Sequence, residues 1–270
     1  DLDIFLPQVR NKISTREKTY VRSLMQNCVR AGARLLRHAA TLGKQAKKST
    51  LPKEDLANLL KAYHREAQDY CIYYNIAFFE KPELEIAKKL AERYSKGQHT
   101  LQTTFSLIAH PSRETDVEHE QDDFLRLCLK KVRNAKALRG LAEQHAQKYG
   151  WLALRFFLGT PWTGDDVLQR VKERGAKDAA AMLAERVAHI KEGKKQVRML
   201  LRRVAPRDRQ RIAQIQDIVF LRSQRADYYH HSAYYVLPIM HHIAHALNIA
   251  YEDMLYFSAS EILSALNNAY

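Results

Sequence analysis

Glycine and proline are scarce in this sequence, with 9 Gly and 7 Pro among 270 residues. Both interrupt helices, so their scarcity beside plentiful Ala, Leu, Lys, Arg, Glu and Gln is typical of a helix-rich protein. No segment shows convincing strand-like alternation, and no repeat of fixed period occurs. Apolar residues make up 46% of the chain, too many for a disordered protein. The sequence therefore predicts an all-α fold, a multi-helix array with a buried core.

Disulfide and zinc frameworks are also missing. Cys28, Cys71 and Cys128 are far apart and odd in number, and no CxxC pair occurs, which fits a reducing compartment. The start of the chain has neither the basic region nor the apolar run of a signal peptide. The longest stretch without Asp, Glu, Lys or Arg, residues 228–251, contains five His and one Pro. We expect a cytoplasmic protein that does not span a membrane.

The familiar catalytic signatures are absent. The sequence has no Gly-rich phosphate loop, no GxSxG, no GxGxxG and no cysteine-based catalytic motif. Because the nine glycines do not cluster, nucleotide binding through such a loop is not expected. We therefore assign no catalytic residue and expect no cofactor within this chain.

Acidic residues are in the minority, with 30 Asp and Glu against 44 Lys and Arg, a net charge of +14. Such an excess favours an anionic partner: nucleic acid, nucleotide phosphates or an acidic protein face. Within the basic run 191–211, five residues fall on one stripe of a predicted helix and form a basic patch: Lys191, Lys194, Lys195, Arg198 and Arg202. A solvated outer face explains this patch without a ligand. The alternative is electrostatic docking to nucleic acid or to an acidic partner.

Helical periodicity and capping signals place the expected helices. Ser14–Glu17, Thr163–Asp166 and Ser258–Glu261 are typical of helix starts. The expected helices cover residues from about 15 to beyond 39, 51 to about 79, 83–94, 117–132, 135–149, a stretch that begins at 163, 176–204 and about 207–247. A short helix is expected after 258. Pro238 is expected to kink the very long helix at 207–247.

The spacing of these helices suggests a division of the chain. Residues 97–116 have no clear helical pattern, and a connection of that length is either functional or a seam between subdomains. We expect an N-terminal helical subdomain at 1–96, a connecting loop at 97–116 and a C-terminal helical subdomain at 117–270. The alternative is one continuous domain.

Tyrosine and histidine are concentrated between Asp227 and His245. His241 and His245 are four residues apart, so they share one helical face as metal-binding pairs do. Position 242 is not Glu, so the zincin motif is incomplete. A crowded interior helix with hydrogen-bonded Tyr and His side chains is the simpler explanation. We assign no metal site and keep these two histidines as its only candidates.

Arginines and aromatic residues supply the candidate ligand contacts. Arg222 and Arg225 are three residues apart on one predicted helix and can form a planar clamp for phosphate or carboxylate. Ordinary salt bridges to neighbouring helices are the simpler explanation for them. The aromatic segment 151–162 is either a ligand pocket or the core of a helix junction. The candidate ligand-binding residues are Arg222, Arg225, Tyr228, His231, Tyr235, Trp151 and Arg155.

Three stretches carry a resemblance to a known family. The first, residues 110–125, is His-Pro-Ser-Arg leading into an acidic helix. The second, residues 145–166, holds HAQKYGW and then GTPWT before Asp166. The third, residues 221–262, combines LRSQR, EDMLY and a final Glu-Ile pair. In order and spacing these stretches resemble the phosphoenolpyruvate-utilising enzyme relatives, the group of phosphoenolpyruvate synthase-like and rifampicin phosphotransferase-like proteins, over roughly residues 100–265.

The resemblance implies that the chain takes part in phosphoryl transfer but does not itself carry the residues that transfer the phosphoryl group. In that family an ATP-grasp domain and a mobile phosphohistidine domain pass on a phosphoryl group, and a helical region of this kind binds the acceptor in antibiotic-modifying members. The family's phosphohistidine has a Thr-x-His context, which no histidine here has. The resemblance thus implies an accessory or acceptor-binding region, inert alone, of a larger protein that uses phosphoenolpyruvate or ATP. Its partner would be a phosphohistidine or ATP-grasp domain, in cis or in trans. The alternative is a non-enzymatic module that binds nucleic acid or an acidic protein through residues 191–211.

Overall fold

The structure is a computed structural model, and it describes Gln8 and residues 20–46, 51–74, 80–95, 100–132 and 134–268. Among these residues the regular structure is helical, without a strand and with one isolated β-bridge between Arg155 and Leu158. The predicted all-α class is confirmed. The very long helix is also confirmed, and it begins at Pro206 and ends at Leu247. The predicted cap at Ser14–Glu17 lies outside the described residues.

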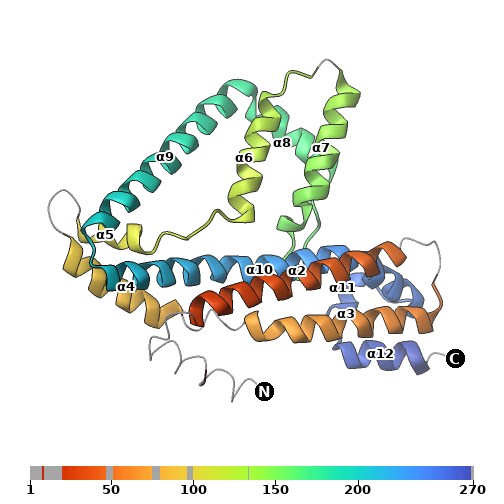
Figure 1. Ribbon diagram of the computed structural model, residues 1–270. Coiled ribbons are helices and arrows are strands. Elements are labelled where there is room, and N and C mark those ends of the chain that lie inside the picture. Colours follow the sequence, from red (N-terminus) through yellow and green to blue (C-terminus); the bar gives the residue numbers. More distant parts are fainter. Residues whose placement is uncertain are drawn as a thin grey trace. The chain divides into compact units, whose positions relative to one another are not determined.

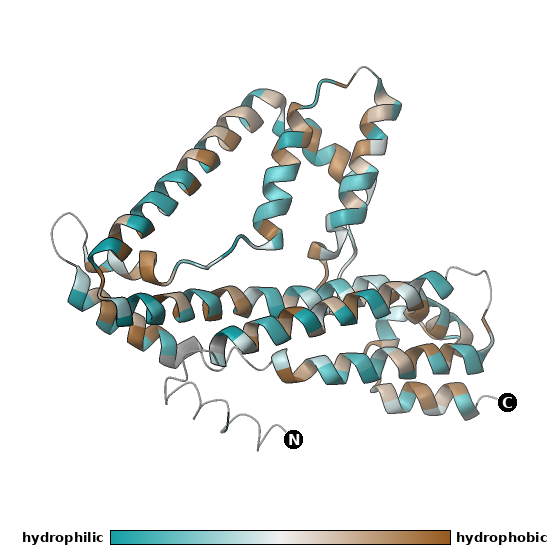
Figure 2. Ribbon diagram, in the orientation of Figure 1, coloured by the Kyte–Doolittle hydropathy of each residue, from teal (hydrophilic) through white to brown (hydrophobic). Residues whose placement is uncertain are grey.

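The described chain forms the α-helices labelled in Figure 1 and a short 3₁₀ helix. In chain order they are α2 (Tyr20–Gln45), α3 (Lys53–Tyr74), α4 (Glu80–Tyr94), α5 (Leu101–Ile108), α6 (Asp116–Leu129), α7 (Ala135–Tyr149), the short 3₁₀ helix η2 (Gly150–Ala153), α8 (Gly164–Arg174), α9 (Ala176–Arg203), α10 (Pro206–Leu247), α11 (Tyr251–Met254) and α12 (Ala259–Asn268). Hydrophobic and hydrophilic residues follow one another along them (Figure 2), as in amphipathic helices.

Side-chain caps fix where several helices begin. At α8, the Thr163 amide donates to Asp166 Oδ2 at 2.7 Å, and the Asp166 amide donates back to Thr163 Oγ1 at 3.2 Å. Ser258 and Glu261 make the same reciprocal pair before α12. Both predicted caps are confirmed, because a capping box depends only on residues three apart in sequence.

The expected loop at 97–116 is wrong for its middle part, where residues 101–108 form α5. Thr100 caps this helix, since its hydroxyl accepts a hydrogen bond from the Thr103 amide at 3.2 Å. Leu107 and Ile108 are buried, which stabilises a helix too short to show a clear period in the sequence.

The chain forms two compact units, each built from three segments. The first unit takes the described residues of Asp1–Asn27, Asn75–Gly150 and Trp162–Gln224, and the second takes those of Cys28–Tyr74, Trp151–Pro161 and Arg225–Tyr270. These units do not coincide with the expected subdomains 1–96 and 117–270. The reason is that α4, although early in the sequence, packs in the first unit with α5, α9 and α10.

Three apolar clusters hold the first unit together. The largest joins α4, α5, the end of α9 and the start of α10: Ala87, Leu90, Ala91, Leu107, Ile108, Leu200, Val204, Ile212 and Ile215. A second joins α6 to the start of α9 through Phe124, Leu125, Cys128 and Ala179. A third joins α6, α7 and α8. Helix α9 is therefore packed at both of its ends, against different helices.

The second unit is built around the close approach of α2 to the C-terminal half of α10. A Cβ added at Gly43 would overlap the backbone carbonyl oxygen of Tyr235, and one added at Gly32 would overlap the ring of Tyr228. The two glycines are eleven residues apart, three helical turns, so they lie on the same face of α2. Tyr63 of α3 joins this core through a hydrogen bond of 3.0 Å with Ser232 of α10.

Replacing Gly43 with Ala should destabilise the protein by about 2 kcal/mol or more, because the backbone of α10 cannot move aside as a side chain can. Gly140 of α7 is the matched control: it is also within a helix, but a Cβ there meets nothing within 4 Å. Gly140→Ala should stabilise the protein by about 0.5–1 kcal/mol. Urea unfolding of both variants measures this, and equal stability of Gly43→Ala and the wild type would refute the close approach.

Candidate functional site

A cavity of about 770 Å³ lies within the first unit, between α5, the segment 109–115, α6 and the middle of α9. We call it the α5–α9 cavity. Its lining includes apolar residues, such as Leu107, Ile190 and Val197, and polar and charged residues of both signs: His110, Ser112, Arg113, Arg186, His189, Lys194 and Arg198, together with the acidic Glu114, Glu118 and Glu185. It can therefore contact an apolar body and, where a cation is not paired with one of these glutamates, an anionic group.

One face of α9 forms a wall of this cavity. Arg186, His189, Gly193 and Val197 line it at intervals of three and four residues, so they lie on the same side of the helix. A Cβ at Gly193 would meet nothing within 4 Å, so the missing side chain leaves the middle of this wall open. Glycine in a helix is unfavourable by about 0.5–1 kcal/mol relative to alanine, and here it widens the cavity.

The cavity lies where α9 has no buried apolar contact: its ends are packed in apolar clusters, whereas its middle is held by polar contacts such as Arg186 with Asp122 and Lys194 with Glu114. Ala179 is fully buried against α6, and Leu200 and Val204 are buried in the cluster with α4, α5 and α10. Between them, Val187 is 51% exposed. Figure 1 shows α9 running from α6 and α8 at one end to α5 at the other.

The segment after α5 forms the opposite wall. The Ser112 amide donates to the backbone oxygen of Gln216 at 3.2 Å, and the Gln216 side chain donates to the Leu107 carbonyl at 3.2 Å. The guanidinium of Arg113 lies 5.8 Å from the centre of the Phe220 ring. These contacts with α10 hold the His110–Arg113 stretch along the cavity.

The charges around the cavity are only partly paired. Lys194 Nζ lies 3.2 Å from Glu114 Oε1. Arg198 has no acidic partner in the described part of the chain, and the same is true of Lys191 and Arg202. The predicted basic patch is thus divided: Lys194 and Arg198 line the cavity, whereas the other three residues do not. Lys195 pairs with Glu192 at 3.5 Å on its own helix.

Three of the predicted ligand contacts come together as a ring stack in the second unit. The His231 ring stacks on Trp151 and on Tyr235, with ring centres 4.7 Å apart in both pairs. Trp151 is only 2% exposed. Burial lowers the pKa of His231 to about 4, so this histidine is neutral at pH 7. His231 and Tyr235 are half-buried, and none of the three stacked residues lines the α5–α9 cavity.

The other predicted contacts lie apart from this stack. Arg225 donates to the Tyr74 carbonyl, and its guanidinium lies 4.5 Å from the centre of the Tyr74 ring. Tyr228 packs edge-on against Tyr70. Arg155 is exposed, and its amide bonds to the Leu158 carbonyl at 2.9 Å. Arg222 belongs to the first unit and Arg225 to the second, so the proposed clamp stays a prediction.

The histidine pair of α10 is exposed. The His241 ring packs 4.3 Å from the Tyr251 ring, and His245 lies one turn further along the helix. Across the described residues, no group of three or more His, Cys, Asp or Glu is arranged to hold a metal ion.

Sequence reasoning missed the contribution of His189 and Gly193 to the cavity. The interval of four residues between them was a usable signal, because it places both on one helical face. This signal was outweighed by the apolar residues that recur at helical spacing at Val187, Ile190 and Val197, a pattern typical of a fully packed face. The exposure of Val187 shows that this face is not packed at the middle of α9, between the buried Ala179 and Leu200.

Substitution of Asp208 should loosen the end of α9. Asp208 Oδ2 accepts hydrogen bonds from Tyr94 Oη at 2.6 Å and Arg93 at 2.8 Å, and Tyr94 also accepts from the Ala205 amide at the α9–α10 turn. These donors, Tyr94 first, hold the pKa of Asp208 below its ordinary value of 3.8. A lowered carboxyl pKa stabilises the fold above pH 4, and this contribution is lost as pH falls through the folded-state pKa.

We expect Asp208→Asn to lose about 1 kcal/mol of unfolding free energy at pH 7 and progressively less below pH 4. The exposed Asp253 is the control, because Asp253→Asn makes the same charge change without those donors. Urea midpoints at pH 7 and pH 3 test this, and a pH-independent loss would contradict the assignment.

Comparison with protein-family models, with curated proteins and with solved structures gave no match to this chain. Cys28, Cys71 and Cys128 are free cysteines, of which Cys71 is exposed. In the part of the chain that the structure describes, no helix is both long and apolar enough to cross a membrane. The functional argument therefore rests on the α5–α9 cavity and its surroundings.

Proposed function

We propose that this chain is the helical acceptor-binding region of a phosphoenolpyruvate-utilising-like phosphotransferase and that the α5–α9 cavity receives the acceptor. The supporting observation is that His110–Arg113, the start of the first resembling stretch, lines this cavity together with α9. Concave sites that combine apolar walls with a few polar groups are the usual form of small-molecule sites.

The lining favours binding over chemistry. Arg198 supplies a cation without an acidic partner among the described residues, and Ile190 and Val197 supply apolar surface. His110 is exposed, and its Nδ1 lies 2.9 Å from the Pro111 carbonyl oxygen. A phosphoryl-carrying domain, phosphohistidine or ATP-grasp in cis or in trans, would supply the transfer step with phosphoenolpyruvate or ATP. This chain would then orient the acceptor, a role that needs position and charge but no nucleophile.

Filling the cavity should block binding without harming the fold. We expect Gly193→Leu to weaken binding of 8-anilinonaphthalene-1-sulfonate, an aromatic anion, by about tenfold, because the added side chain enters open space in the cavity wall. Gly140→Leu is the control, since Gly140 is equally open but lies on α7. Fluorescence titration measures both affinities. If both variants bind like the wild type, the cavity is not the site and the proposal fails.

The alternative function, binding of nucleic acid or an acidic protein, is favoured by the exposed charges of Lys191 and Arg202, which have no acidic partners in the described part of the chain. These residues and Lys195 do not line the cavity. The two functions can therefore be separated by substitution.

If the alternative holds, replacing Lys191, Lys195 and Arg202 with Gln lowers the slope of log K against log salt for duplex DNA by about 2–3, since each phosphate contact contributes about 0.9. Replacing Lys88, Lys89 and Lys172 with Gln is the charge-matched control. Fluorescence anisotropy between 50 and 200 mM salt, the range over which such binding weakens strongly, measures the slope. The acceptor-binding proposal predicts the same slope for both triple variants.

A further inference from the structure

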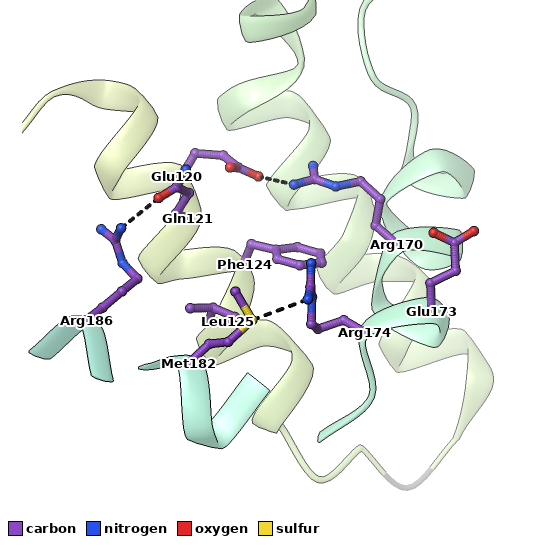
Figure 3. Close-up of a pocket in the computed structure, with 9 residues that line it drawn as sticks. All are labelled: Glu120, Gln121, Phe124, Leu125, Arg170, Glu173, Arg174, Met182 and Arg186. Carbon is purple, nitrogen blue, oxygen red and sulfur yellow. Dashed lines mark hydrogen bonds and ion pairs between the residues drawn. The ribbon is translucent and has the colours of Figure 1, made fainter. Parts of the chain in front are cut away.

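A second cavity, of about 580 Å³, lies between α6, α8 and the start of α9. We call it the arginine pocket. Figure 3 shows Arg170 and Arg174 extending from α8 toward α6, and Met182 and Arg186 reaching the pocket from α9. Phe124 and Leu125 of α6 provide its apolar floor. Each helix contributes residues four apart, so each presents one continuous face to the pocket.

Two of the three arginines are engaged by acidic residues. Arg170 donates to Glu120 Oε1 at 2.9 Å, and His145 Nε2 lies 3.0 Å from the same oxygen. Arg186 donates to Asp122 Oδ1 at 2.7 Å and to Gln121 Oε1 at 2.7 Å. The carboxylate of Glu120 is almost fully buried, at 3% exposure of the residue. These ion pairs hold both guanidiniums in place beside the pocket.

Arg174 is different. It donates a hydrogen bond to the sulfur of Met182 at 3.3 Å, and it has no acidic partner in the described part of the chain. Thioether sulfur is a weak acceptor, so this guanidinium keeps most of its capacity to bind an oxyanion. The nearby Glu173 is exposed on α8 and accepts from Gln169 at 2.9 Å.

Arg170 forms part of the wall beside Arg174. Its guanidinium carbon lies 4.3 Å from the centre of the Phe124 ring and 4.4 Å from that of Trp162, which fixes the plane of the group. One terminal nitrogen bonds to Glu120, whereas the other is buried without a hydrogen-bond partner among the described residues and does not face the open pocket. Arg170 therefore positions the wall of the pocket, and Arg174 is the cation available to a ligand.

We propose that the arginine pocket binds a small organic oxyanion, a carboxylate or phosphate group on an apolar body. The oxyanion lies against Arg174, because a planar guanidinium matches the geometry of both groups. The apolar body covers Phe124, Leu125 and Met182. The arginine pocket shares Arg186 with the α5–α9 cavity, but Arg174 and the apolar residues that would contact the ligand do not line that cavity. The inference does not depend on the function proposed for the α5–α9 cavity.

The test uses isothermal titration calorimetry of the full chain with three ligands of similar shape: benzoate, phenyl phosphate and neutral benzyl alcohol. We expect at least one of the two oxyanions to bind and benzyl alcohol not to. The ratio of the two oxyanion affinities identifies the favoured group. Arg174→Gln should weaken binding about tenfold, the effect of removing a charge-assisted hydrogen bond.

Lys172→Gln is the matched control, because it removes a cation from the same last turn of α8 without touching the pocket. It should change affinity less than about twofold, since surface charges away from a ligand contribute little. Gly193→Leu should leave the effect of Arg174→Gln unchanged, since Gly193 does not line this pocket and only binding in the α5–α9 cavity would be altered. No binding of either oxyanion at millimolar concentration, equal loss in the two charge variants, or disappearance of the Arg174→Gln effect in the Gly193→Leu background would each overturn the proposal.

Discussion

The separate anchoring of the two ends of α9 is the constraint on which the first unit depends. Its start packs on α6 through Ala179, and its end enters the cluster of Leu200 and Val204 with α4, α5 and α10. A helix held in this way is kept straight by its own hydrogen bonds, so its middle remains away from the chain that faces it. The α5–α9 cavity follows from this geometry. The arginine pocket lies beside the first anchor.

The two units differ in how their polar and charged side chains are used. In the first, cationic side chains face cavities: Arg198 at the α5–α9 cavity and Arg174 at the arginine pocket. In the second, the polar aromatic residues are used for packing, and burial keeps His231 in the stack uncharged at pH 7. This contrast favours the first unit as the ligand-binding part and the second as a scaffold, which is why our functional proposals concern the first.

Local features of the sequence predicted local features of the fold. The caps at Thr163 and Ser258 and the helix Pro206–Leu247 depend on residues three or four apart, so they could be found without the structure. Helix α5 was missed because eight residues are too few for a period, and its stability comes from burial of Leu107 and Ile108. The units could not be predicted, since each joins segments that are distant in sequence.

The candidate sites were harder to predict than the fold. A charge pattern predicts which side of a helix is polar, but it does not distinguish a solvated face from a cavity wall. Lys194 lines the α5–α9 cavity, whereas the adjacent Lys195 does not. Trp151, His231 and Tyr235 were predicted only as ligand contacts, and the structure brings their rings together as a stack. Whether such a cluster encloses a ligand or fills a core depends on packing among three or more helices.

The most direct test of an open α5–α9 cavity is the alkylation rate of a cysteine placed by Gly193→Cys, followed by mass spectrometry of the peptide that contains it. An open wall predicts a rate close to that of a free peptide thiol and strong protection by 8-anilinonaphthalene-1-sulfonate. Leu200→Cys, at a position that is 1% exposed, gives the buried reference. Equal, slow alkylation at both positions would contradict the account, because it would mean that the middle of α9 is packed like its end.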